Sequence, residues 1–161
     1  MIAVPRVLRT PDSADFFDYA RLGKLLLRRC DSCGAVRGPQ ERFCPQCHAA
    51  AHTMTHAQGS ASLVSWAVVH RSPLPALEEQ TPFTTGIVEL TEGPWLLIRV
   101  LTAPGEALRA GMELEIWIAA AGAGEGEPLV LAQTKQVSRA GHRQAGSGGE
   151  RAISGCRRLS S

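Results

Sequence analysis

Long apolar runs are missing from this sequence. No stretch approaches the roughly 20 apolar residues that a membrane-spanning helix needs, and residues 1–6 lack the apolar core of a secretory signal peptide. A nucleophile elbow, a P-loop and a dinucleotide-binding signature are absent as well. These absences predict a cytoplasmic protein that does not associate with membranes and is not itself an enzyme.

Basic and aromatic residues are scarce in the middle of the chain. Aromatic residues make up 5% of the 161 residues. Residues 59–132 hold three basic and nine acidic residues, although the whole chain has a net charge of +2 because both flanking segments are basic. A surface that binds nucleic acid needs a basic groove with exposed aromatic side chains. The acidic centre therefore makes nucleic acid an unfavourable partner.

Four of the five cysteines form two C-x-x-C pairs, Cys30 with Cys33 and Cys44 with Cys47, and ten residues separate the pairs. In a reducing cytoplasm such pairs bind metal rather than form disulfides. Two C-x-x-C turns that face each other supply the four thiolates of a tetrahedral zinc site. Gly34 follows the first pair and can adopt the positive φ that a tight turn needs. The spacing predicts a structural zinc ion in a zinc ribbon, with iron, as in a rubredoxin-like redox protein, as the alternative.

Three histidines, His48, His52 and His56, follow the second pair. They could act as alternative ligands, but a complete set of four cysteines leaves no vacancy at the metal. We therefore interpret them as loop residues, two of them in a connector over residues 49–58. His70, near a predicted strand end, is assigned no role, and Cys156 has no partner in the sequence and is predicted to be a free thiol.

A helix is predicted before the ribbon. The first strand of the ribbon is expected at residues 24–29, and a loop at residues 35–42 connects the two knuckles. Thr10 and Pro11 are typical of a helix start, and Gly23 is typical of the residue after a helix end. The apolar side chains of this helix form one stripe: Phe16, Phe17, Tyr19, Ala20 and Leu22. Such a stripe docks on the protein's own domain, or forms a partner surface or the wall of a ligand channel.

From residue 59 the pattern changes to strands separated by turns. In residues 112–118, Met112, Leu114, Ile116 and Ile118 alternate with Glu113, Glu115 and Trp117. This alternation is typical of a half-buried strand. Residues 72–82 form a proline-rich loop that is too long for a tight hairpin. Five strands are predicted, at residues 60–71, 83–90, 95–101, 112–118 and 128–132. Five strands in this order fit a small closed Greek-key barrel, the OB-fold.

The last segment, residues 133–161, is rich in Gly, Ser and Arg and shows no apolar period. This composition cannot bury enough surface to order itself, so the segment is predicted to be a disordered basic tail. The predicted fold is therefore mainly β, with three parts. They are the N-terminal helix and zinc ribbon at residues 11–58, the OB-fold barrel at residues 59–132, and the tail at residues 133–161.

The order of helix, zinc ribbon and barrel resembles the DUF35 family of OB-fold proteins with an N-terminal helix and a rubredoxin-like zinc ribbon. The resemblance covers about residues 13–132. The matching stretches include Asp15-Phe16-Phe17, Gly23-Lys24-Leu25, Arg29-Cys30-Asp31-Ser32-Cys33-Gly34, Cys44-Pro45-Gln46-Cys47 and Val88-Glu89-Leu90-Thr91-Glu92-Gly93.

The resemblance implies a non-catalytic subunit that binds acyl-CoA and serves as a scaffold. Its partner would be a thiolase-like, hydratase-like or aldolase-like enzyme of acyl-CoA, sterol or polyketide metabolism. Helix, ribbon and barrel would together hold the pantetheine and acyl portion of CoA. The expected ligand-binding residues are Phe16 and Phe17 in an apolar groove, and Lys24, Arg28, Arg29 and Arg71 at the phosphates.

Two departures from the family pattern stand out. His48 occupies the place after the last cysteine where the family usually has glycine, so the second knuckle could turn differently. The barrel usually closes with a further conventional strand, whereas residues from Gln133 onward become the basic tail. A zinc-ribbon and OB-fold protein that binds nucleic acid remains the alternative function, with Trp66, Phe83, Trp95 and Trp117 as the available aromatic residues.

Overall fold

The computed structural model describes residues 7, 9–119, 126–135 and 156–158. Strands are the main regular secondary structure of these residues, which confirms the predicted mainly-β fold class. Neither α-helix in this part of the chain is long and apolar enough to cross a membrane. The elements in chain order are the 3-10 turn η1 (Pro11–Ser13), α1 (Ala14–Arg21), β1 (Leu26–Cys30), β2 (Val36–Arg37), β3 (His52–His56), β4 (Ser60–Val69), α2 (Pro75–Glu78), β5 (Phe83–Leu90), β6 (Trp95–Leu101), β7 (Glu113–Ala119), β8 (Leu129–Thr134) and β9 (Cys156–Arg158).

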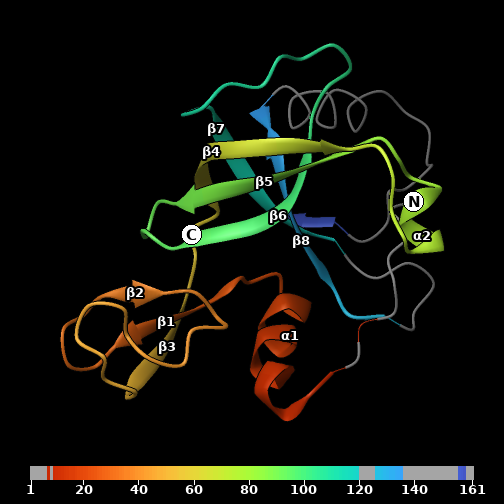
Figure 1. Ribbon diagram of the computed structural model, residues 1–161. Helices are drawn as coiled ribbons and strands as arrows, with labels where there is room; N and C mark the ends of the chain where they lie inside the picture. The colour runs from red at the N-terminus through yellow and green to blue at the C-terminus, as the bar shows by residue number, and fades with distance from the viewer. Residues whose placement is uncertain (1–6, 8, 120–125, 136–155, 159–161) are drawn as a thin grey trace, which may run out of the picture.

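Five strands close into a barrel, as the sequence predicted (Figure 1). Their order is β4-β5-β6-β8-β7, and β4 returns to β7, with Ser60 opposite Glu115. The pairs are antiparallel except β6 with β8, where Arg99 lies opposite Leu131 in parallel register. This arrangement is the Greek-key topology of an OB-fold. The interior side chains follow the predicted alternation on β7, where Leu114, Ile116 and Ile118 are buried.

A three-stranded sheet, β2-β1-β3, forms the ribbon below the barrel in Figure 1. The sequence predicted only β1, and the interpretation of residues 49–58 as a connector was wrong for β3. All five residues of β3 pair with β1, from His52 opposite Cys30 to His56 opposite Leu26. None of them is fully buried, so the backbone ladder rather than an apolar pattern specifies this strand. His52 and His56 are therefore strand residues and not loop residues.

The predicted helix is confirmed, although its first turn is the 3-10 turn η1 rather than α-helix. Thr10 and Ser13 cap the start of this turn through reciprocal hydrogen bonds. Gly23 ends the helix with φ of 75°. Of the apolar stripe, Phe17 and Ala20 are buried, whereas Leu22 is 68% exposed. The apolar stripe of the helix therefore packs mainly against the rest of this protein.

One apolar core joins helix, ribbon and barrel. Ala20 of α1, Leu25 and Leu27 beside or within β1, and Ala57 before β4 pack into the same cluster as the barrel interior. An ion pair supports this docking, because the buried carboxylate of Glu127 lies 3.1 Å from the guanidinium of Arg21. The helix is thus attached both to the ribbon and to the segment that leads into β8.

The predicted tail begins later than residue 133. β8 continues through Thr134, and β9 pairs with β7, with Cys156 opposite Ala119. β8 pairs with both β6 and β7, so the barrel closes without an additional strand. Residues 136–155 and 159–161 of the predicted disordered tail lie outside the described residues.

Gly86 on β5 lies where neighbouring atoms leave little room for a side chain. A Cβ at this position would lie 3.0 Å from Leu63 Cδ1, from the Ser65 carbonyl oxygen and from Val100 Cγ2. Because two of these atoms belong to the packed interior, Gly86→Ala should lower the free energy of unfolding by about 1–3 kcal/mol, measured by urea denaturation. Gly38→Ala is the control, since its nearest contact is the Gln40 side chain at 3.7 Å. Equal stabilities for the two variants would contradict this packing.

Candidate metal centre and adjoining groove

Two knuckles with the same backbone geometry place the four cysteines. The Gly34 amide donates to the Cys30 carbonyl and the His48 amide donates to the Cys44 carbonyl, each at 2.9 Å. Gly34 has φ of 77° and His48 has φ of 59°, which is unusual for a residue other than glycine. His48 therefore turns the second knuckle in the same way as Gly34 turns the first.

The four sulfur atoms lie together in a compact group. All lie within 4.8 Å of one another, and Cys30 to Cys47 and Cys33 to Cys44 are each 3.5 Å apart. Zinc bound at about 2.3 Å to four sulfurs in a tetrahedron needs S···S separations of about 3.8 Å. The donor set fits zinc, and four thiolates leave no open coordination position for a substrate. Cys30 and Cys44 are buried, and Cys33 and Cys47 are exposed.

Backbone amides aimed at the sulfurs favour thiolates. Hydrogen bonding from the Cys33 amide is the largest effect on Cys30 and lowers the pKa of that thiol to about 6. The Cys47 amide likewise lowers the pKa of Cys44. The Ala35 amide would lower the pKa of Cys33, but hydrogen bonds with Cys44 and Cys47 outweigh it and raise that pKa to about 12. Metal binding therefore has to displace a proton at Cys33, which makes it weaker as the pH falls.

Arg37 on β2 is a buried residue that the sequence placed in a loop. It is 1% exposed, and its guanidinium donates to the Ala50 carbonyl at 2.8 Å and approaches the Ala49 carbonyl at 3.5 Å. These bonds fix the chain just after the second knuckle. A single arginine among polar residues gives no sequence signal for such a role.

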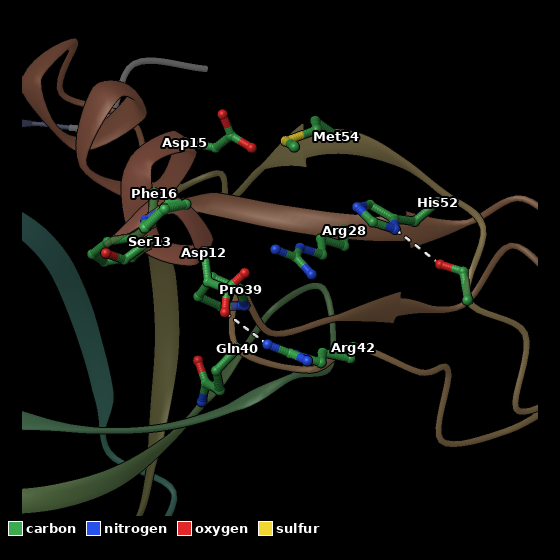
Figure 2. A pocket seen from close by; sticks show the side chains of 12 residues that line it. Asp12, Ser13, Asp15, Phe16, Arg28, Pro39, Gln40, Arg42, His52 and Met54 are labelled. Carbon is green, nitrogen blue, oxygen red and sulfur yellow. Dashed lines mark hydrogen bonds and ion pairs between the residues drawn. The ribbon is translucent and has the colours of Figure 1, made fainter. Parts of the chain in front are cut away.

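A groove with a volume of about 840 Å³ lies beside the metal centre. The start of α1 forms one wall, β1 and β3 form another, and the segment around Pro39 and Arg42 forms a third (Figure 2). Its lining combines apolar, basic and acidic side chains, among them Phe16 and Met54, Arg28, Arg42 and His52, and Asp12 and Asp15.

The structure brings two of the predicted ligand-binding residues into this groove, Phe16 and Arg28. Phe17 lies in the core at 8% exposure, in edge-to-face contact with Phe16. Three predicted residues are exposed and do not line the groove: Lys24, Arg29 and Arg71. Arg29 instead donates to the Gly34 carbonyl at 3.3 Å.

Of the twelve residues that line the groove, ten were not predicted as ligand-binding residues, among them the basic side chains of Arg42 and His52. Both come from segments interpreted as loops, and each reaches the groove only because the ribbon folds back toward α1. His52 Nδ1 lies 3.0 Å from the Ala50 carbonyl oxygen. Of the histidines that follow the second pair, none joins the cysteines in the metal-binding group found among the described residues.

The left-handed conformation of His48 has a testable cost. His48→Gly should stabilise the zinc-bound ribbon by up to about 1 kcal/mol, because glycine adopts this φ without strain. His48→Val should destabilise it by about 1–2 kcal/mol. Resistance of bound zinc to a competing chelator measures both effects. Faster zinc loss from His48→Gly than from the unmodified protein would show that the imidazole itself stabilises the knuckle.

Two family models match the chain one after the other. Residues 17–53 match the rubredoxin-like zinc ribbon domain of ChsH2, and residues 55–119 match the C-terminal OB-fold domain of ChsH2. Together the matches span more than half of the chain. Their order agrees with the ribbon and barrel of the structure, and the boundary between them falls within β3 (His52–His56).

Curated relatives share the same region. A probable enoyl-CoA hydratase alpha subunit of Thermomonospora curvata is 31% identical over 117 residues, which are 72% of this chain and 36% of that protein. A DUF35 domain-containing scaffold protein of Methanocaldococcus jannaschii is 30% identical over 88 residues, 54% of this chain and 62% of that protein. The chain thus spans about a third of the first relative's length and under two thirds of the second's.

A solved structure of an Ltp2-ChsH2(DUF35) aldolase contains a similar chain. The two superpose with a TM-score of 0.67 at 28% identity, over 81% of this chain and 99% of the other. Sequence matches, fold and the cysteine geometry agree. The chain belongs to the DUF35 family, in which a rubredoxin-like zinc ribbon precedes an OB-fold domain.

Proposed function

We propose that this chain is a non-catalytic subunit of an acyl-CoA-processing enzyme, to which it contributes a groove for CoA. The partner enzyme is thiolase-like, hydratase-like or aldolase-like, and acts in acyl-CoA, sterol or polyketide metabolism. The four cysteines hold a structural zinc ion, and the chemistry takes place on the partner.

The groove between α1 and the ribbon is the observation that carries this proposal. It combines an apolar wall around Phe16 and Met54 with the guanidinium of Arg28. Acyl-CoA needs both kinds of contact, because its pantetheine and acyl parts are largely apolar and its nucleotide end is anionic. The filled coordination sphere of the metal site supports a structural rather than a catalytic role for zinc.

The relatives support a partner role. One is named as a subunit of an enoyl-CoA hydratase, one as a scaffold protein, and one is part of an aldolase complex. All three names describe proteins that work within assemblies. The outward face of β6 suits an assembly too, since Trp95 is 57% and Leu97 is 72% exposed.

Co-expression with the acyl-CoA enzyme encoded nearest to this gene tests the proposal. Affinity purification of this chain should recover that enzyme, and isothermal titration of the zinc-loaded complex should detect CoA binding. The isolated chain should not turn over acyl-CoA. Turnover by the chain alone, or failure to recover the enzyme together with failure to bind CoA, would overturn the proposal.

The alternative function, nucleic-acid binding, has a less favourable surface. Trp66 and Trp95 are exposed on the barrel, which a base-stacking surface would need. The same barrel segment contains only three basic residues against nine acidic ones. Its repulsion of phosphates would outweigh stacking at physiological salt.

A further inference from the structure

Arg28 occupies the groove without a carboxylate partner. No ion pair of Arg28 occurs among the described residues, and its Nε is buried with no hydrogen-bond partner. One terminal nitrogen only approaches the Glu41 carbonyl at 3.5 Å. Figure 2 shows its guanidinium extending from β1 into the space facing α1. An unpaired, partly desolvated guanidinium in a cavity favours an anionic ligand.

A second guanidinium, that of Arg42, lies at the same groove but is already engaged. Its terminal nitrogen is 2.7 Å from Asp12 Oδ2, so the pair connects two walls of the groove (Figure 2). Both side chains are largely exposed, at 73% and 80%. An ion pair this exposed is weak and exchanges readily with other partners.

The charges of the groove make a phosphate the strongest competitor for Arg42. Arg28, Arg42 and His52 are basic, whereas Asp12 and Asp15 are acidic. A phosphate carries more charge than one carboxylate and accepts two parallel hydrogen bonds from a guanidinium. It can therefore displace Asp12 from Arg42, while the carboxylate of Asp15 in the same groove disfavours any anion.

We propose that this groove binds the phosphorylated nucleotide end of CoA through Arg28 and Arg42, and that Asp12 competes with the phosphate for Arg42. The inference rests on the proposed function and specifies which end of CoA lies here. Phe16 offers an aromatic face for the adenine ring in the same groove. Asp12 then sets the affinity, because each binding event has to break its ion pair.

Substitution of Asp12 gives the decisive test. The zinc-loaded full chain is titrated with CoA, in complex with its enzyme where the two co-purify. Asp12→Asn should bind CoA about 2–5-fold more tightly than the unmodified protein, which is the range expected from removing an exposed ion pair. Arg28→Ala and Arg42→Ala should each weaken binding about 10-fold. In the Arg42→Ala background, Asp12→Asn should have no further effect.

Asp18→Asn is the matched control. Asp18 is an exposed aspartate of α1, the helix that follows η1 and Asp12; it pairs with Arg9 and does not line the groove. Its substitution should leave the affinity for CoA unchanged. Zinc content and circular dichroism of every variant establish that the ribbon is folded.

Fragments of CoA distinguish the two ends of the ligand. Adenosine 3′,5′-bisphosphate should compete with CoA much more strongly than pantetheine, which lacks the phosphates that Arg28 and Arg42 would bind. If CoA binds but Asp12→Asn does not tighten binding, or only pantetheine competes, the inference fails and the proposed function stands. If the partner enzyme co-purifies and neither CoA nor the bisphosphate binds, both the inference and the CoA groove are wrong, while the partner role remains.

Discussion

Cys44→Ser is expected to abolish zinc binding and to unfold the ribbon. The Cys44 sulfur is fully buried, 3.5 Å from that of Cys33, and a serine hydroxyl is a poor replacement for a thiolate. Zinc contributes about 10–16 kcal/mol to the folding of comparable small metal domains, and this three-stranded sheet has little core of its own. Metal analysis after dialysis should find no bound zinc, and amides of β1 and β3 should lose protection from hydrogen exchange.

Cys156→Ser is the control for that experiment. The fifth cysteine lies on β9, far along the chain from both knuckles, and its substitution should leave one zinc per chain. The unmodified protein should be colourless, because iron in four thiolates would give a red protein. Full zinc occupancy and unchanged amide protection in Cys44→Ser would contradict a metal-dependent ribbon.

The double substitution Trp95→Ser with Leu97→Ser is expected to weaken binding to the acyl-CoA enzyme by at least about 30-fold. The reason is that aromatic and aliphatic anchors buried at an interface contribute about 2 kcal/mol or more to binding. Both side chains point outward from β6, while the neighbouring Leu96 faces the core. Trp95 lies opposite Glu89, so the partner surface should be apolar with a nearby cation. Biolayer interferometry with immobilised partner measures the change.

Leu74→Ser provides the matched control for this surface. Leu74 is 47% exposed, but it precedes α2 and is not part of β6. Its substitution should leave the affinity unchanged, and all three exposed positions should alter stability by no more than about 0.5 kcal/mol. Unchanged affinity in a folded double variant would assign the partner to another face.

Local signals in the sequence were enough for much of this fold. The C-x-x-C spacing predicted the knuckles, because two cysteines three residues apart meet in any such turn. Alternation predicted β7 as soon as Leu114, Ile116 and Ile118 were seen two residues apart. Capping residues predicted α1 between Thr10 and Gly23, since helix ends depend on side chains within a few residues of each other.

Features that depend on distant parts of the chain needed the tertiary structure. β3 is a strand because it completes the ladder on β1, not because its own side chains show a period. His48 turns the second knuckle because its amide makes the same kind of backbone hydrogen bond as the amide of Gly34. A pattern of side chains does not reveal such a backbone bond.

The groove is the clearest case of this difference. Asp12 and Arg42 are 30 residues apart in the sequence, and they meet only because the ribbon packs beside α1. The predicted phosphate-binding residues were basic side chains implied by the family resemblance, and of these only Arg28 reaches the groove. The sequence by itself determined the metal ligands and the strand pattern, because these are local in the chain. Only the tertiary structure decided which charges share a cavity, because that depends on how separate elements pack.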